Sequence, residues 1–441
     1  MHILPKKKRL VLTWLIDLEW RNIQASGLLD ELSSRFEEIV ILGSTFGTQA
    51  DPKTLPANVV SRKSRWLFAD PTLSWLAAIC TIYYVCRDTK FPERIHASYR
   101  KNQQRNFFLA RNFFWLFRPI FLVLLVFRTL LVLPALMRLR PSLLVTQSFV
   151  WSAYDSIVGL YARWAGIPWM SIVTSWDNTT NKGEFHLKPQ KILVWGNQNI
   201  IDGQAFLRMP ESAIVALPPP HFTRLRAIKE ETPTKKAKHI LYLGTTNPNF
   251  PQQTEFVHAL AKLVRKMGIT DRYPLVVRPH PNDSAAWAKE FSGVAGVVLD
   301  EDTQNRQSQW SVYSTDRDAL DKYYRLLRDS LAVINVYSTA TVEAALLGTL
   351  SIVPRIFFPP EQEFKSLHDG QYHTRELRKS PGLLAAKSME ELEQQLRKLV
   401  NEGVDPALVE AHLRHCEVIS KYPPADLLRQ YGDVITGFAR D

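Results

Sequence analysis

Cysteine is scarce in this chain, and its few cysteines form no recognisable ligand pattern. The 441 residues contain three, Cys80, Cys86 and Cys416, with no Cys-x-x-Cys pair and no cysteine–histidine spacing typical of zinc. This scarcity argues against a disulfide framework and gives no support for a structural zinc site. A reducing compartment such as the cytosol is therefore expected.

Acidic residues are outnumbered by basic ones. The chain has 43 Asp and Glu against 55 Lys and Arg, which gives a formal net charge of +12 and a pI near 9.5. This surplus favours an anionic partner, which nucleic acid, an anionic membrane surface or a phosphorylated substrate would each satisfy. No basic helix or stacked-aromatic motif accompanies the charge, so no nucleic-acid partner is expected.

The N-terminal segment lacks the marks of a cleaved leader peptide. Basic residues precede an apolar run, but the run is short, carries Asp17 and Glu19, and has no small-residue cleavage site. We expect it to form a first β-strand. The length of the chain favours two or three domains, and no fixed-period repeat is present.

One long apolar tract occupies residues 105–140. A membrane-spanning helix needs roughly 20 apolar residues, and a central arginine such as Arg128 costs about 2.5–3.5 kcal/mol on insertion scales. Pro119 and Pro134 lie toward the ends of the tract, and a single span would separate parts of one predicted sheet. Two interpretations stay open, namely a pair of core helices or an interfacial helix whose arginines meet anionic headgroups.

Strand-like and helix-like segments alternate in two series, which predicts an α/β protein with two parallel sheets. The first series opens with a strand at 10–17, a loop at 18–22, a helix at 23–36 and a strand at 37–44. A segment rich in proline and charge, without apolar periodicity, separates the two series. The predicted organisation is a Rossmann-like domain at 1–220, a linker at 221–238, a second Rossmann-like domain at 239–420 and a closing helix at 421–441.

Two motifs in the second series suit an anion. RPHP places Arg278 and His280 where a buried strand ends, and YSTATVEAALLG places Ser338 and Thr339 where a helix begins. Helix N-termini bind phosphate, and ligands bind beyond the carboxyl ends of parallel strands. His280 could equally be structural, and Ser338 or Thr339 could simply cap the helix.

Glu343 follows in the same motif. A capping-box glutamate would stand three residues after the cap, where this chain has Thr341. We therefore expect Glu343 to be free to hold two ribose hydroxyls, with a favourable interaction with the helix dipole as the alternative.

Weaker signals surround these motifs. Gly244 and Thr245 end the first strand of the second series and could line a donor phosphate. His373 lies in a polar segment after the last predicted strand, consistent with acceptor binding or with a solvated loop. The acidic run at 300–302 is better explained as a solvated turn, so no metal is expected.

The first series offers groups for an acceptor. TSWDNTTNKG follows a strand, and its carboxylate, amide and basic groups could position a sugar or accept a proton, although an Asx-turn would explain the same residues. The candidates in this motif are Trp176, Asp177, Asn178 and Lys182.

The end of the first strand adds further candidates. Asp17 and Glu19 could supply a base for an acceptor hydroxyl, and Arg21 and Asn22 could bind the acceptor.

Taken together, WRNIQASGLLDEL, SWDNTTNKG followed by ILVWGNQN, RPHP, and VYSTATVEAALLG resemble a bacterial family of GT-B glycosyltransferase-like proteins of surface-polysaccharide assembly. More distantly, the chain is similar to CDP-glycerol polyol-phosphate transferases and to HP-motif capsule sialyl- and Kdo-transferases. The resemblance runs from Trp20 to about Leu392. Thr339 stands where the HP-type sialyltransferases tend to have a second serine, so the donor class stays open.

The resemblance implies two Rossmann-like domains facing a cleft, with the nucleotide donor in the C-terminal one. It places His280, Ser338 and Thr339 on phosphate and Glu343 on ribose, and leaves the acceptor to the N-terminal domain. No cofactor is expected beyond the nucleotide-activated donor, because Arg278, His280 and the helix end at Ser338 could stabilise the leaving nucleotide without a metal.

The expected function is transfer of a sugar from a nucleotide-sugar donor to a lipid-linked or oligosaccharide acceptor in bacterial surface-polysaccharide synthesis. We expect a cytoplasmic protein bound peripherally to the inner, anionic face of the membrane. The alternatives are a CDP-polyol phosphotransferase on the same fold, a nucleotide-sugar epimerase, and a non-catalytic membrane assembly factor.

Overall fold

The chain is described here from a computed structural model. It describes residues 8–14, 17–43, 55–63, 70–87, 103–148, 152–231, 237–245, 250–280, 284–300, 316–356 and 369–439.

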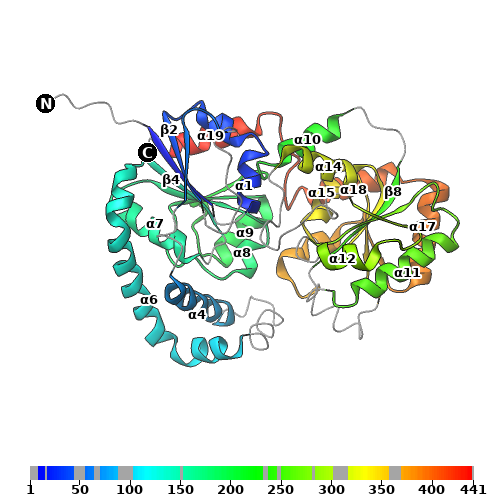
Figure 1. Ribbon diagram of the computed structural model, residues 1–441, viewed down its shortest axis with the longest axis horizontal. Coiled ribbons are helices and arrows are strands. Elements are labelled where there is room, and N and C mark those ends of the chain that lie inside the picture. The colour runs from blue at the N-terminus through cyan, green and yellow to red at the C-terminus, as the bar shows by residue number, and fades with distance from the viewer. Residues whose placement is uncertain are drawn as a thin grey trace. The chain divides into compact units, whose positions relative to one another are not determined.

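The chain divides into two compact units, each built on one parallel sheet (Figure 1). Unit 1 comprises Met1–His221 together with Pro424–Asp441, and unit 2 comprises Phe222–Pro423. The predicted α/β class is confirmed.

Within the described residues, the unit 1 sheet has the strand order β3-β2-β1-β4-β5-β6-β7, with every pair parallel. Its strands are β1 (Arg9–Trp14), β2 (Glu38–Gly43), β3 (Val59–Lys63), β4 (Leu143–Ser148), β5 (Trp169–Val173), β6 (Lys191–Val194) and β7 (Ile214–Ala216). Its helices are α1 (Asp17–Gln24), α2 (Leu28–Ser33), α4 (Pro71–Arg87), α6 (Gln104–Leu139), α7 (Ala153–Trp164), α8 (Asn178–Asn181), α9 (Asn197–Ala205) and α19 (Leu427–Phe438).

Both faces of this sheet are covered, as is usual for parallel sheets. Along β1, Leu10 and Leu12 pack in one core cluster with residues of α1, α2 and α19. Val11, between them, packs in the opposite cluster with residues of α4, α6 and α7. The C-terminal helix α19 is therefore part of unit 1, and the Tyr431 hydroxyl also donates to the Pro218 carbonyl at 3.0 Å.

The unit 2 sheet, over the described residues, has the parallel order β10-β9-β8-β11-β12-β13. Its strands are β8 (His239–Leu243), β9 (Leu275–Arg278), β10 (Val297–Leu299), β11 (Ser330–Ile334), β12 (Ser351–Pro354) and β13 (Leu383–Ala386). Its helices include α10 (Phe222–Glu230), α11 (Gln253–Lys266), α12 (Ser284–Phe291), α14 (Arg317–Arg328), α15 (Thr339–Leu347), α17 (Met389–Glu402) and α18 (Pro406–Cys416).

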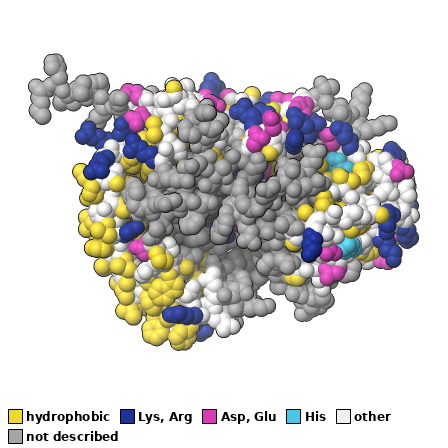
Figure 2. Space-filling model, viewed as in Figure 1, with side chains coloured by type: hydrophobic (Ala, Val, Ile, Leu, Met, Phe, Trp, Pro, Cys, Tyr) yellow, Lys and Arg dark blue, Asp and Glu magenta, His cyan; other side chains and the backbone are white. Residues whose placement is uncertain are grey.

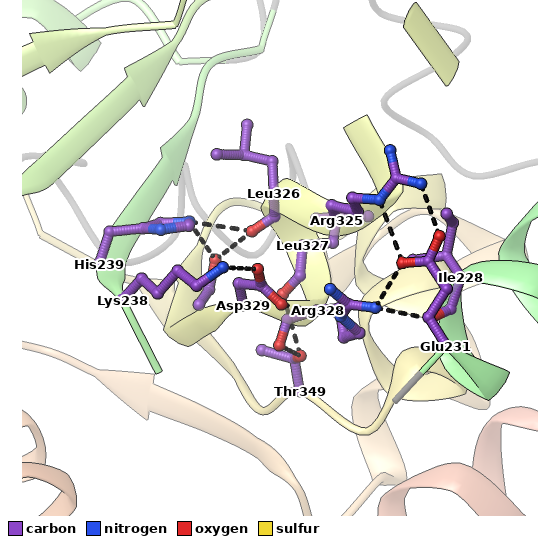
Figure 3. A network of polar contacts seen from close by, with 11 residues as sticks. Ile228, Glu231, Lys238, His239, Arg325, Leu326, Leu327, Arg328, Asp329 and Thr349 are labelled. Atoms are coloured by element: carbon purple, nitrogen blue, oxygen red, sulfur yellow. Dashed lines mark hydrogen bonds and ion pairs between the residues drawn. The ribbon is translucent and has the colours of Figure 1, made fainter. Parts of the chain in front are cut away.

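A polar network holds the amino-terminal ends of β8 and β11 together (Figure 3). His239 Nε2 lies 2.9 Å from the Leu326 carbonyl and 3.0 Å from Ser330 Oγ, and burial lowers the pKa of His239. Asp329, at the end of α14, pairs with Lys238 and Arg328, each at 2.7 Å. This network belongs to the edge of the sheet opposite the carboxyl strand ends.

The apolar tract forms α6, which consists of two helical segments joined at a kink, and it is only partly buried, whereas one expectation was a pair of core helices. Its 36 residues include a non-helical residue, Phe113, where the helix kinks. A buried stripe on one side packs against α4 and α7. The opposite side is rich in exposed apolar side chains.

Other local expectations were wrong. The predicted loop at 18–22 is part of α1, and the single helix expected after it is broken at Gly27, whose φ is 87°. The predicted linker at 221–238 begins with helix α10. Its buried residues, Phe222, Leu225 and Ile228, are spaced three apart among charged residues, which hid the helical pattern.

Candidate functional site

The carboxyl end of β8 lies directly against the RPHP motif. The Gly244 amide donates to the Arg278 carbonyl at 2.8 Å. A Cβ added to Gly244 would lie 3.0 Å from both Pro279 Cα and the His280 nitrogen. Glycine therefore permits this close approach, because backbone atoms on the other side cannot move away easily.

Thr245, the next residue, is held by its backbone. Its N–H donates to Gln253 Oε1 at 3.1 Å, and its carbonyl accepts from Gln253 Nε2 at 2.8 Å. Gln253 is buried in the first turn of α11. The strand end next to RPHP is thus fixed from two sides.

The N-terminus of α15 is organised by Asn335, which directly follows β11. Asn335 Nδ2 donates to Ser338 Oγ at 2.9 Å and to Thr341 Oγ1 at 3.1 Å. Thr341 Oγ1 in turn accepts from the Ser338 backbone N–H at 3.3 Å, as the third residue of a capping box. The expectation that no capping box closes this turn was wrong, because threonine takes the place of the usual glutamate.

Basic side chains lie near Tyr337, which precedes the cap of this helix. Arg355 follows β12 directly, and its Nη2 lies 3.2 Å from Asp369 Oδ2, while Arg378 Nη1 lies 4.0 Å from Asp369 Oδ1. Tyr337 precedes the helix cap and also hydrogen-bonds Asp369. Burial, with the adjacent Asp369 carboxylate, raises the pKa of Tyr337 to about 12. Two arginines sharing one carboxylate leave positive charge in excess around Tyr337, the residue before the cap of α15.

Glu343 lies in a tyrosine pocket rather than standing free. It is 3% exposed, and its carboxylate accepts from the Tyr323 hydroxyl at 2.7 Å and from the Tyr324 hydroxyl at 3.4 Å. Arg278 lies over the Tyr323 ring, 5.0 Å from its centroid, and pairs with Asp300. A continuous contact chain therefore joins the ends of β9 and β10 to α14 and α15.

Unit 2 thus brings most of the predicted donor residues to one edge. Strands β10, β9, β8, β11 and β12 are consecutive neighbours. Arg278 is the last residue of β9, and the residues that directly follow the other four strands are Asp300, Gly244, Asn335 and Arg355. His280 and Thr339 are half-buried at the same edge, whereas His373 is buried in a short 3-10 helix, Tyr372–Arg375.

In unit 1, the SWDN turn is closed by its own threonines and by α9. Thr179 Oγ1 donates to the Trp176 carbonyl at 3.1 Å. Asn199 Nδ2 donates to the same carbonyl at 2.7 Å and to Thr179 Oγ1 at 2.8 Å. Trp176 is a core side chain, 2% exposed. Its ring therefore has almost no accessible surface with which to contact an acceptor, as had been predicted for it. Asp177 and Lys182 are half-buried.

Several buried polar atoms at this edge have no hydrogen-bond partner in the structure as described. They are Asn22 Oδ1, Gln147 Nε2, Thr174 Oγ1 and both amide atoms of Asn178. Gln147 lies near the end of β4 and Thr174 directly follows β5, whereas Asn22 lies in α1, the helix after β1, and Asn178 begins α8. Strands β1, β4 and β5 are adjacent in the sheet. Because each orphaned buried group costs about 1–3 kcal/mol, such groups call for a ligand or a water.

The remaining predicted residues of unit 1 belong to α1. Glu19 is fully buried, Arg21 is half-buried, and Asp17 begins the helix with its side chain outside the described part of the structure. Asp17 and Glu19 were expected to be possible bases on an exposed loop. Glu19 instead lies buried in a helix.

Sequence reasoning missed Asn335, Thr341, Tyr323, Arg355 and Arg378. A usable signal existed for Asn335 and Arg355, since each follows a buried strand immediately. Arg378 and Tyr323 come from segments whose side-chain direction the sequence pattern does not specify.

Comparisons with known proteins give structural matches only. No protein-family model matches the sequence, and no curated protein matches it. A UDP-GlcNAc 2-epimerase from Methanocaldococcus jannaschii aligns with a TM-score of 0.53 at 9% identity, over 97% of this chain and 99% of that chain. An S. aureus MnaA–UDP co-structure aligns with a TM-score of 0.53 at 10% identity, over 98% and 97%.

A variant of the wall teichoic acid polymerase TagF aligns with a TM-score of 0.51 at 11% identity, over 99% of this chain and 90% of that chain. The chain has the GT-B fold. Identities this low show the architecture of two Rossmann-like units and leave the reaction to other arguments.

Proposed function

We propose that the chain is a glycosyltransferase that takes a sugar from a nucleoside-diphosphate-sugar donor and transfers it to a saccharide or lipid-linked acceptor. In this proposal unit 2 holds the donor and unit 1 supplies groups for the acceptor. The proposed reaction needs no metal ion, since arginines and a helix N-terminus would stabilise the leaving diphosphate.

The observation that carries the proposal is the N-terminus of α15. Its backbone N–H groups lie at the carboxyl edge of the sheet, its cap residue Ser338 is fixed by Asn335, and Arg355 and Arg378 supply positive charge near Tyr337, the residue before the cap. A helix N-terminus with adjacent arginines suits a diphosphate, which takes hydrogen bonds from backbone and guanidinium donors together.

His280 and Arg278 would complete the donor site from the end of β9, which β8 separates from β11 in the sheet. The packing of Gly244 against the RPHP backbone fixes where His280 leaves the sheet. His280 would donate to the diphosphate, and Glu343 would receive the ribose hydroxyls in exchange for those of Tyr323 and Tyr324.

Unit 1 offers the acceptor a set of unsatisfied polar groups. Asn178 and Asn22 hold buried amide atoms without partners in the described chain, and sugar hydroxyls would supply both donors and acceptors for them. Asp177, at the start of α8, is the proposed base. The acceptor oxygen would bond to the anomeric carbon, its proton would pass to Asp177, and the nucleoside diphosphate would leave with the bonding electrons.

A nucleotide-sugar epimerase is the second candidate, because two solved UDP-GlcNAc 2-epimerases share the fold over nearly the full length of both chains. An epimerase would use the same donor edge but would need no acceptor.

Product analysis separates these reactions. The purified chain is incubated with nucleotide sugars, with and without saccharide or lipid-linked acceptors. Transfer predicts release of nucleoside diphosphate only when acceptor is present. Interconversion of donor sugars without acceptor would favour the epimerase, release of nucleoside monophosphate from a CDP-polyol would favour the phosphotransferase, and no turnover of any donor would contradict the enzyme proposal.

A further inference from the structure

Helix α6 has two apolar sides, of which only one is buried. The buried stripe recurs every three or four residues and includes Phe114, Phe121, Leu125, Val132 and Leu136. This spacing matches one face of an α-helix packed on a core. The face accounts for the anchoring of α6 on unit 1, and nothing in that packing requires apolar residues on the other face.

The other face is apolar and exposed along most of the helix. Trp115 is 76% exposed, Val123 67%, Phe127 55% and Leu131 56%. Figure 2 shows apolar side chains gathered in a band along α6, with Lys and Arg at both ends of the band. Large contiguous apolar patches on a protein surface mark sites of interaction.

The packing of α6 opposes a transmembrane position. Among the described residues it is the one helix long and apolar enough to cross a bilayer. Its buried stripe belongs to the core of unit 1, which a spanning helix would have to abandon.

Charge identifies the occupant of the exposed face. The sequence of α6 contains no Asp or Glu, and Arg105, Arg111, Arg138 and Arg140 are exposed near its two ends. None of these four arginines has an ion-pair partner in the part of the chain that the structure describes. A second copy packed symmetrically on this face would set arginines against arginines, with no carboxylate on the helix to neutralise them.

We propose that α6 is an in-plane membrane anchor: its exposed face enters the interface of an anionic lipid bilayer, and its terminal arginines contact headgroup phosphates. The axis lies parallel to the bilayer, so apolar side chains reach the acyl boundary while the buried stripe stays on unit 1. The anionic cytoplasmic leaflet is the matching surface. This inference is independent of the reaction proposed above.

The test is flotation of the full chain with vesicles of phosphatidylcholine containing phosphatidylglycerol. The variant combines Trp115→Gln, Val123→Gln and Phe127→Gln, which removes apolar area while keeping a helix-forming residue at each position. Its matched control is Ile201→Gln, at an apolar side chain 61% exposed on α9. We expect the triple variant to lose affinity for vesicles by at least about a hundredfold, and the control to bind as the wild type does.

The arginines are tested separately with Arg111→Gln and Arg138→Gln. Their loss should weaken binding to anionic vesicles and leave the residual binding to pure phosphatidylcholine unchanged. Salt at about 1 M, where the Debye length is near 3 Å, should release the wild-type protein only in part.

A second measurement guards against misfolded variants. Brominated lipid chains should quench part of the wild-type tryptophan emission, and Trp115→Phe should lose that quenched part. The proposal is overturned if wild-type protein fails to bind anionic vesicles at low salt, or if the triple variant and the control bind alike. It is also overturned if Trp115→Phe is quenched as strongly as the wild type, or if the face is covered by a stable dimer in solution.

Discussion

Gly244→Ala should disturb the donor edge more than its size suggests. The added methyl carbon would lie 3.0 Å from Pro279 Cα, 3.0 Å from the His280 nitrogen and 3.4 Å from the Pro279 carbonyl carbon. All three are backbone atoms, so the RPHP segment must shift as a whole. Overpacking of this kind costs about 1–3 kcal/mol.

Hydrogen–deuterium exchange measures this loss of stability within unit 2. The backbone amides of β8 and β9 report the opening of the unit 2 sheet, whatever the stability of unit 1. Faster exchange should accompany weaker binding of a nucleoside diphosphate. Gly437→Ala is the matched control, since a methyl at Gly437 meets nothing within 4 Å and alanine favours the helix. Unchanged exchange and unchanged affinity in Gly244→Ala would refute the role assigned to this contact.

Further outcomes are expected elsewhere. Glu343→Gln should weaken ribonucleotide binding and spare 2′,3′-dideoxy analogues in calorimetry, because an amide accepts from two hydroxyls poorly; equal losses would remove Glu343 from the ribose. Asp177→Asn should lower turnover by about a hundredfold or more with donor affinity unchanged, and joint loss of both would return Asp177 to an Asx-turn. Burial, with a smaller contribution from His415, lowers the pKa of His412 to about 4. Between these two pKa values His412 is protonated in the unfolded chain and neutral in the folded one. The unfolding free energy should therefore fall by about 3 kcal/mol as pH drops from 6.5 to 4. His412→Gln should lose that part of the pH dependence in urea titrations, and an identical slope would contradict it.

The sequence predicted the two parallel sheets because buried central strands such as β4, β8 and β11 are continuous apolar runs between turn residues. It missed β3, β7 and β13, the short strands at sheet edges. Arg62 and Lys63 in β3, and the half-exposed Leu383 and Leu384 in β13, weaken the apolar signal there.

The sequence predicted where several candidate residues lie in the fold, but not which side chains surround them. Strand-end logic placed Arg278, His280 and Ser338 at one sheet edge, where the structure has them. It could not place Arg378, because no local rule orients a side chain from a 3-10 turn toward a carboxylate such as Asp369. The mistake at Glu343 has the same origin, since its partners Tyr323 and Tyr324 come from α14.

The central claim is that unit 2 binds a nucleotide through its diphosphate at the N-terminus of α15. Calorimetric titration of the full chain with UDP, CDP, GDP and ADP, each beside its nucleoside, tests this directly. We predict that at least one diphosphate binds, and that His280→Ala weakens it by about 1.5–3 kcal/mol while leaving nucleoside binding almost unchanged. Absence of binding by every diphosphate, or equal affinities for a diphosphate and its nucleoside, would contradict the claim.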